Sequence, residues 1–227
     1  MAMMKLNIQR FTDLDFETAQ TEAFISVINA QFPRIIEGID GLTKAITTLT
    51  EDWGDGNAYT YGNNFNDVYK ELQLSITRYV NSVGGFAKSA GDAFAEMYNL
   101  SARFSFNGNS NFASVPSFNK VNSRGQEGPI DESIAEKFAN AFSAGTDTIS
   151  NAIQLIWNGI SSNPNAFPED VQREALATIN VENANVLTKL RNTGNAYREY
   201  LKPYLDEACA KVAEGRAAAA GTSSSAN

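Results

Sequence analysis

The side chains that most often carry proton-transfer and metal chemistry are scarce in this chain of 227 residues. It contains no histidine and a single cysteine, Cys209. Without histidine, neither a Ser-His-Asp nor a Cys-His nucleophile can be assembled, and zinc lacks its usual nitrogen and sulfur ligands. The chain also lacks the glycine fingerprints of phosphate-binding and dinucleotide-binding loops. We therefore expect no catalytic residues, no cofactor, no metal and no small-molecule substrate.

Oxygen ligands that could hold a calcium ion lie around Trp53. Asp52 and Asp55 flank this tryptophan, and Asn57 follows. Such oxygens can bind calcium, but the spacing misses the EF-hand pattern and the later glutamate is absent. Solvated loop acids are the favoured interpretation. Cys209 lies on a predicted helix, where we expect an inert thiol.

The charge balance excludes several classes of partner. The net charge is −8, and the 18 lysines and arginines are scattered along the chain. Binding to nucleic acid or to an anionic membrane needs concentrated positive charge, so neither is expected. No apolar run reaches 18 residues, so we expect no membrane span. Met1 to Phe11 lacks the apolar core of a signal peptide.

Apolar periodicity predicts two helices in the first half of the chain. The first spans about 17–52, with apolar residues at alternating steps of four and three: Ile28, Phe32, Ile35, Ile39, Leu42, Ile46 and Leu49. The second spans about 64–99, with a similar seam: Phe65, Val68, Leu72, Ile76, Tyr79, Val83, Phe86, Ala90, Ala93 and Met97. Alternating threes and fours form a heptad seam, which packs against another helix. Pro33 should kink or interrupt the first helix.

Two further helices are predicted in the second half. The third spans about 131–157, with Asp131 as its N-cap or first-turn acid. Its seam is Ile134, Phe138, Phe142, Gly145, Ile149, Ile153 and Ile156. The fourth begins near Pro168, because a proline followed by two acids favours a helix start. Its seam includes Ala175, Ile179, Val186, Leu190, Tyr197, Leu201, Tyr204 and Ala208, and Pro203 should kink it.

A tryptophan and a glycine mark each expected hairpin turn. The two sequences are Trp53-Gly54-Asp55-Gly56 and Trp157-Asn158-Gly159. Glycine leaves the helical region at little cost, and a tryptophan can cover the open end of an apolar seam. A groove for a partner at the turn is the alternative role. The expected fold is all-α: two long antiparallel helical hairpins that form a four-helix bundle.

The expected hairpins occupy 17–99 and 130–215, between segments of different composition. An arm covers 1–16, an irregular linker rich in Asn, Ser and Phe covers 100–129, and a disordered tail covers 216–227. Asn107-Gly108 suggests a small β-hairpin in the linker. The four linker phenylalanines either pack back onto the bundle or form a contact surface for another subunit: Phe104, Phe106, Phe112 and Phe118.

The two hairpins resemble the ESAT-like proteins of type VII secretion systems, which are helical hairpins with a Trp-x-Gly turn. Trp157-Asn158-Gly159 matches that motif, whereas in the first turn Gly56 falls one position late. The resemblance covers roughly 20–100 and 130–210. It implies a fused pair of hairpins that folds on itself like a dimer. The family's export signal, a Tyr followed four residues later by an acid, has no match after the last helix, so an export partner would carry it.

The start of the chain resembles a different group. Residues 4–11, MKLNIQRF, look like the opening of many virion proteins from phages of Gram-positive bacteria. This resemblance implies a non-enzymatic virion or virion-assembly component, found in the virion or in the bacterial cytoplasm during assembly. The alternative is a type VII secretion substrate or partner, exported without a cleavable signal peptide. Either function needs protein partners, and the candidate contacts are Leu6, Ile8, Phe11 and the four linker phenylalanines.

Overall fold

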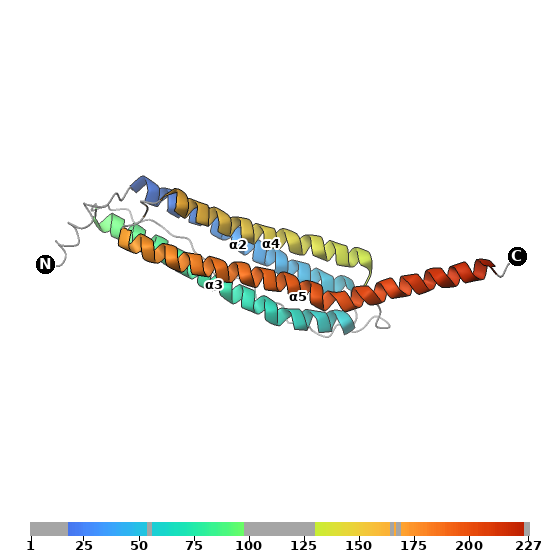
Figure 1. The fold of residues 1–227 in the computed structure, drawn as a ribbon. Coiled ribbons are helices and arrows are strands. Elements are labelled where there is room, and N and C mark those ends of the chain that lie inside the picture. The colour runs from blue at the N-terminus through green and yellow to red at the C-terminus, as the bar shows by residue number, and fades with distance from the viewer. Residues whose placement is uncertain (1–17, 54–55, 98–129, 164–165, 167–168, 225–227) are drawn as a thin grey trace.

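The computed structural model describes residues 18–53, 56–97, 130–163, 166 and 169–224. Within them lie four helices: α2 (Thr18–Trp53), α3 (Gly56–Met97), α4 (Glu132–Ser162) and α5 (Glu169–Ser224). They form an elongated four-helix bundle, which confirms the predicted all-α fold (Figure 1). The predicted arm and the predicted linker, with its β-hairpin, lie outside the described residues.

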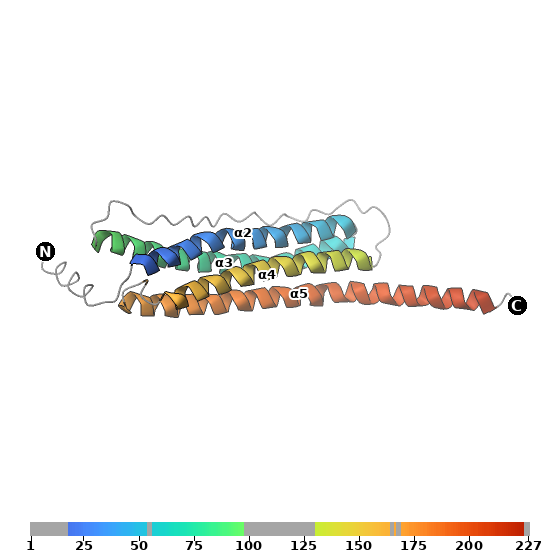
Figure 2. The same ribbon diagram turned by 90° about the horizontal axis from the view of Figure 1, so that it is seen from above.

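The helices pair across the two halves of the chain. α2 and α3 run antiparallel, as do α4 and α5, and the first hairpin packs on the second mainly through α2 against α4 and α3 against α5 (Figure 2). The end of α3 and the start of α4 lie at opposite ends of the bundle (Figure 1). α3 and α4 therefore point in the same direction, which distinguishes this bundle from a simple up-down-up-down arrangement.

The predicted heptad seams form the core. All seven seam residues predicted for the first helix are buried in α2, from Ile28 to Leu49. In α4 the seam residues Phe138, Phe142 and Ile149 are also buried, while Ile134 is half-buried. Each large apolar side chain removed from water in this way stabilises the fold by roughly 1.5–3 kcal/mol.

Two glycines allow α2 and α4 to cross at short distance. A Cβ at Gly38 would lie 2.5 Å from Ile149 Cγ1 and 3.0 Å from the carbonyl oxygen of Gly145. A Cβ at Gly145 would lie 2.8 Å from Leu42 Cδ2 and 3.1 Å from the carbonyl oxygen of Gly38. Leu42 follows Gly38 by one turn, just as Ile149 follows Gly145. The two contacts are therefore related by a local two-fold axis, and each large side chain fills the space above the opposite glycine.

The start of α4 is capped as predicted. Asp131 adopts an extended backbone conformation, and its side chain accepts a hydrogen bond from the Ser133 backbone N–H at 2.8 Å. The Ser133 hydroxyl donates to the same carboxylate oxygen at 2.5 Å. These hydrogen bonds lower the pKa of Asp131 below its usual value, first through the Ser133 side chain and then through its backbone.

Pro33 does not interrupt the first helix, as one form of the prediction had it, and the predicted start of the second helix was wrong. α2 is continuous through Pro33, whose side chain is exposed, because Phe32 and Ile35 on either side are buried and hold the helix across the missing hydrogen bond. α3 begins at Gly56, well before the predicted start at 64. Ala58 and Tyr61 are each 1% exposed, so burial extends the apolar face by almost two turns.

The C-terminal segment also differs from the prediction. The expected tail began at 216, yet α5 continues to Ser224, with Pro203 in its interior. Alanine has the highest helix propensity, and 217–220 are all alanine. Because the preceding bundle has already nucleated α5, each added residue gains a hydrogen bond without a new nucleation cost.

Tyr69 and Tyr79 are both buried on α3, but their hydroxyl groups have different surroundings. The Tyr69 hydroxyl donates to the Ile39 carbonyl at 2.8 Å and lies 2.6 Å from the Thr43 hydroxyl. Burial raises its pKa to about 12. The Tyr79 hydroxyl has no hydrogen-bond partner among the described residues, and burial raises its pKa as well.

Removing the two hydroxyls should therefore have opposite consequences. Tyr69→Phe should lower the free energy of unfolding by about 0.5–1.5 kcal/mol, because a tertiary hydrogen bond is lost and the Ile39 carbonyl loses a donor. Tyr79→Phe should leave stability unchanged or raise it, because it removes a buried polar atom that has no hydrogen-bond partner among the described residues. Urea denaturation at neutral pH measures both. Equal losses for the two variants would contradict the described hydrogen bonding.

Candidate interaction surfaces

All seven predicted contact residues lie outside the part of the chain that the structure describes. Leu6, Ile8 and Phe11 belong to the arm, and the four linker phenylalanines, Phe104, Phe106, Phe112 and Phe118, belong to the linker. Both segments, together with Gly54, lie outside the described residues. The surfaces discussed below therefore come from the four helices.

Trp53 ends α2 at the first hairpin turn, and Gly56 begins α3 just beyond it. The indole is half-buried and joins three helices. Its ring lies 4.9 Å from the Tyr204 ring of α5 in an edge-on arrangement, and 6.1 Å from the Tyr61 ring of α3. The tryptophan thus packs over one end of the core. Its Nε1 atom is buried without a hydrogen-bond partner among the described residues.

The predicted second turn at Trp157 and Gly159 was wrong. Both residues lie inside α4, which continues to Ser162. Gly159 is buried because α2 approaches it: a Cβ there would lie 3.0 Å from Val27 Cγ1. The glycine serves helix packing, and Trp157 is half-buried against the core. The offset that relates Gly38 to Gly145 also relates Trp53 to Ile160, so the two tryptophans are not structurally equivalent.

The actual connection between α4 and α5 is fixed by polar contacts. Asn163 is the C-cap of α4, and its side chain donates to the Gly159 carbonyl at 2.6 Å. The Ala166 N–H donates to the Asn163 carbonyl at 3.0 Å. The buried Thr21 hydroxyl of α2 donates to the Ala166 carbonyl at 2.7 Å. The start of α2 is therefore attached to this connection, which was not predicted because the two residues are 145 positions apart in the sequence.

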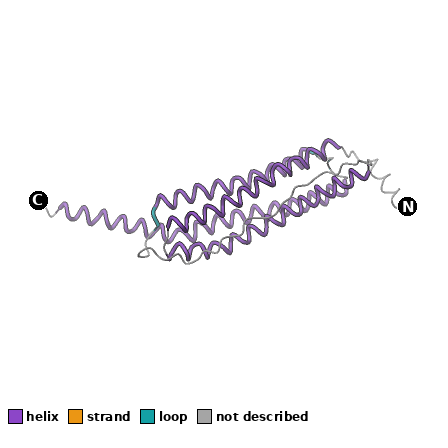
Figure 3. The backbone as a smooth tube through the Cα atoms, turned by 180° about the vertical axis from the view of Figure 1, so that it is seen from behind, coloured by secondary structure: helices purple, strands orange, loops and turns teal. Residues whose placement is uncertain are grey.

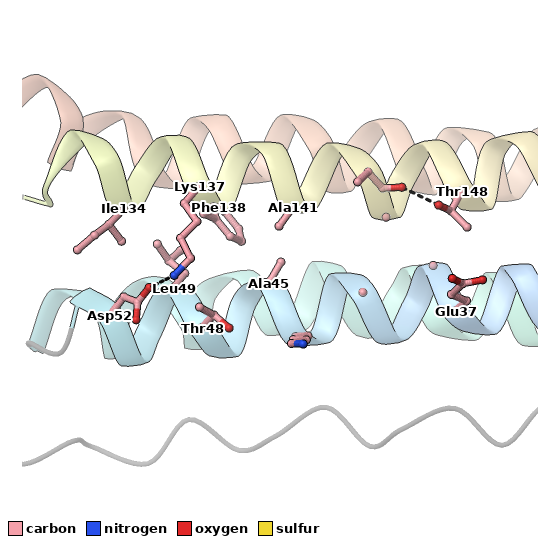
Figure 4. A pocket seen from close by; sticks show the side chains of 15 residues that line it. Glu37, Ala45, Thr48, Leu49, Asp52, Ile134, Lys137, Phe138, Ala141 and Thr148 are labelled. Carbon is pink, nitrogen blue, oxygen red and sulfur yellow. Dashed lines mark hydrogen bonds and ion pairs between the residues drawn. The ribbon is translucent and has the colours of Figure 1, made fainter.

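A groove of about 450 Å³ lies between α2 and α4 (Figure 4). Its floor is formed by small residues from both helices: Gly38, Gly41, Ala45, Ala141 and Gly145. Ala45 and Ala141 point toward each other across it. Lys137 Nζ and Asp52 Oδ2 close one end of the groove with an ion pair at 2.8 Å. Solvent-exposed ion pairs of this kind add little stability.

A second groove of about 520 Å³ runs between α4 and α5. Phe142 and Leu190 form its buried wall, and Asp147, Arg191 and Arg198 supply charges of both signs. This groove exists because α4 and α5 pack against each other less closely than the other neighbouring helices do.

The last surface is the end of α5, which extends beyond the rest of the bundle (Figures 1 and 3). Tyr204 and Leu205 are the last large apolar residues that pack on the core. From 209 to 218 every residue is exposed, and Val212 is 54% exposed. We call 206–224 the α5 projection. Sequence reasoning missed it because the alanine-rich segment was interpreted as a tail.

Among the described residues we find surfaces for contact, and no cluster of reactive side chains. Within the described ranges, no cluster of three or more His, Cys, Asp or Glu residues is placed to hold a metal ion. Cys209 is an exposed thiol. None of the described helices combines the length and apolar character that crossing a membrane requires.

Comparison with known proteins gives no relative for this chain. No protein-family model, no curated protein and no solved structure matches it.

Proposed function

We propose that this protein is a non-enzymatic structural or interaction protein that acts as a component of a phage virion or of virion assembly. The observation that carries the proposal is the shape of the described chain. The apolar seams of the four long helices are buried in a single rod-like core, and α5 continues beyond it with an exposed surface. Such a rod offers long side surfaces and a projecting end to neighbouring subunits.

The opening sequence supports the choice of a virion. Residues 4–11 resemble the start of virion proteins from phages of Gram-positive bacteria. The scarcity of histidine and cysteine in the sequence agrees with a role in binding. In this proposal the partners are other protein subunits, and the protein is found in the particle or in the bacterial cytoplasm during assembly.

The alternative is an ESAT-like substrate or partner of a type VII secretion system with two fused hairpins. It is favoured by two features of the helices. Two antiparallel hairpins pack on each other, and Trp53 lies at the turn of the first hairpin. Export without a cleavable signal peptide would be the expected behaviour.

Incorporation into particles distinguishes the two functions. We expect the protein to be present at a fixed copy number in particles purified from a producing strain. Deleting 1–12, or replacing Phe104, Phe106 and Phe112 with serine, should reduce incorporation several-fold if these segments are contacts. Leu74→Ser is the matched control, because Leu74 is a 54% exposed residue on α3. Normal incorporation of both variants would show that these segments are not the contacts. Absence from particles, with export that depends on a secretion ATPase, would establish the alternative.

A further inference from the structure

The groove between α4 and α5 has an apolar wall that is still open to solvent. Leu190 of α5 and Phe142 of α4 are buried in this wall, and the Phe142 ring stacks on the half-buried Tyr197 ring at 5.2 Å. Leu187 lines the same groove and remains 44% exposed. A further apolar side chain can therefore be buried here.

The α5 side of the groove is periodic. Four of its lining residues follow one another at steps of four, three and four, which places them on one face of the helix: Leu187, Arg191, Gly194 and Arg198. The two arginines are two turns apart, about 10.5 Å along the axis. Gly194 lies between them, and a Cβ there would have no atom within 4 Å. The groove thus presents two guanidinium groups on either side of an open space.

Neither arginine has a partner in the part of the chain that the structure describes. Arg191 and Arg198 donate no hydrogen bond and form no ion pair to a described residue, whereas Lys189 and Lys202 of the same helix are both ion-paired. Asp147 is the one carboxylate among the described residues that line this groove, and it pairs with neither arginine. The groove therefore carries a net positive charge on a chain whose net charge is −8.

The spacing of the arginines favours a helical partner. All α-helices share the same rise, so carboxylates seven residues apart on a partner helix match the arginine spacing. In an extended peptide, side chains on one face recur at roughly 6.7 Å and 13.4 Å, and neither distance matches. The charges match as well, because arginine binds a carboxylate through two parallel hydrogen bonds.

We propose that the groove between α4 and α5 binds an acidic amphipathic helix of a partner protein, with two carboxylates seven residues apart. The carboxylates pair with Arg191 and Arg198. An apolar side chain midway between them lies over Gly194 and contacts Phe142 and Leu187, in the helix-in-groove mode. This inference goes beyond the proposed function because it states the chemistry of one partner. It is tested in dilute solution with the full chain, so its failure leaves the proposed function standing.

Two designed peptides test the charge match. The probe is a fluorescein-labelled helical peptide of about 21 residues with two glutamates seven residues apart and leucines midway between them, and in its control both glutamates are lysines. Fluorescence anisotropy with the full chain at low salt should give a Kd on the order of 10–100 μM for the glutamate peptide, because the contact is small. The lysine peptide should bind at least roughly tenfold more weakly. Equal binding of the two peptides, or no binding of the glutamate peptide below about 1 mM, would overturn the proposal.

Arginine variants test the location of the site. Arg191→Gln combined with Arg198→Gln should weaken binding of the glutamate peptide by about tenfold, and Arg191→Glu combined with Arg198→Glu should make the chain prefer the lysine peptide. Arg78→Gln is the matched control, because Arg78 is an exposed arginine on α3 that does not line the groove. Circular dichroism checks that each variant keeps its helices. An Arg78 variant that loses as much binding as the double variant, or a charge reversal that leaves the preference unchanged, would contradict the assignment.

Two other occupants would give different results. A fluorescein-labelled DNA duplex of about 20 base pairs that bound through the same arginines as tightly as the peptide would reveal a general polyanion site. A parent that dimerises in sedimentation equilibrium, while the Arg191→Gln, Arg198→Gln variant stays monomeric, would identify a second copy of this chain as the occupant. We expect neither result, and either one would refute the acidic partner helix.

Discussion

Replacing Gly38 with alanine is expected to lower the free energy of unfolding by about 1–3 kcal/mol. The added methyl group would lie 2.5 Å from Ile149 Cγ1 and 3.0 Å from the Gly145 carbonyl oxygen. The first contact requires a buried side chain to move, and the second requires the α4 backbone to move. Urea denaturation monitored by circular dichroism measures the loss. The gain in helix propensity on replacing glycine, about 0.5–1 kcal/mol, is too small to offset this overlap.

Gly194→Ala is the matched control for this prediction. Gly194 lies inside α5, and a Cβ there would have no atom within 4 Å. Its replacement should therefore raise the free energy of unfolding by about 0.5–1 kcal/mol. Combining Gly38→Ala with Ile149→Ala should cost less than the sum of the single changes, because the second change removes the side chain that the first one strikes. Equal effects at Gly38 and Gly194 would mean that α2 and α4 do not approach at this crossing.

Gly38 and Gly159 also show where sequence reasoning reaches its limit. A glycine that ends a helix and a glycine that admits a neighbouring helix look the same in the local sequence, since both simply lack a side chain. The distinction depends on the opposite helix: Ile149 lies against Gly38 and Val27 lies against Gly159. The turn predicted at Trp157 and Gly159 was wrong for this reason.

Features that depend on local or periodic signals were predicted well. The alternating steps of four and three placed every predicted apolar residue of α2 in the core. Asp131 was predicted as an N-cap or first-turn acid, and it is the N-cap, a role that needs only the N–H groups two or three residues later. The sequence predicted that the two hairpins pack into one bundle, but it did not predict which helices pair across them, because contacts such as Thr21 with Ala166 join residues far apart in the sequence.

The surfaces were the hardest part to predict. The residues chosen as contacts were the apolar ones with no place in a seam, and they fall in the arm and the linker, outside the described residues. The α5 projection was missed because alanine, glycine and serine carry little hydrophobic signal. This segment is helical because the bundle has already nucleated α5. That nucleation depends on the whole fold and is not visible in the local sequence.

Replacing Phe142 with alanine should have the largest effect of any single change considered. Phe142 of α4 is 3% exposed, and its ring lies 5.7 Å from Phe65 of α3, 5.2 Å from Tyr197 of α5 and 5.7 Å from Phe138. These aromatic contacts join three helices across the middle of the bundle. The change should lower the free energy of unfolding by about 3–5 kcal/mol, from lost apolar burial and the cavity left behind.

The location of Phe142 gives this loss a structural consequence. α4 and α5 pack together least closely, and Phe142 with Tyr197 lines the groove between them. Without the ring, α4 loses its stacked aromatic contact with Tyr197 of α5, so hydrogen exchange should accelerate first in α4 and α5. Leu155→Ala on the same helix is the control, because Leu155 is 48% exposed and its loss should change stability by less than about 0.5 kcal/mol. If Phe142→Ala behaved like Leu155→Ala, the aromatic contacts across α3, α4 and α5 could not be what holds the two hairpins together.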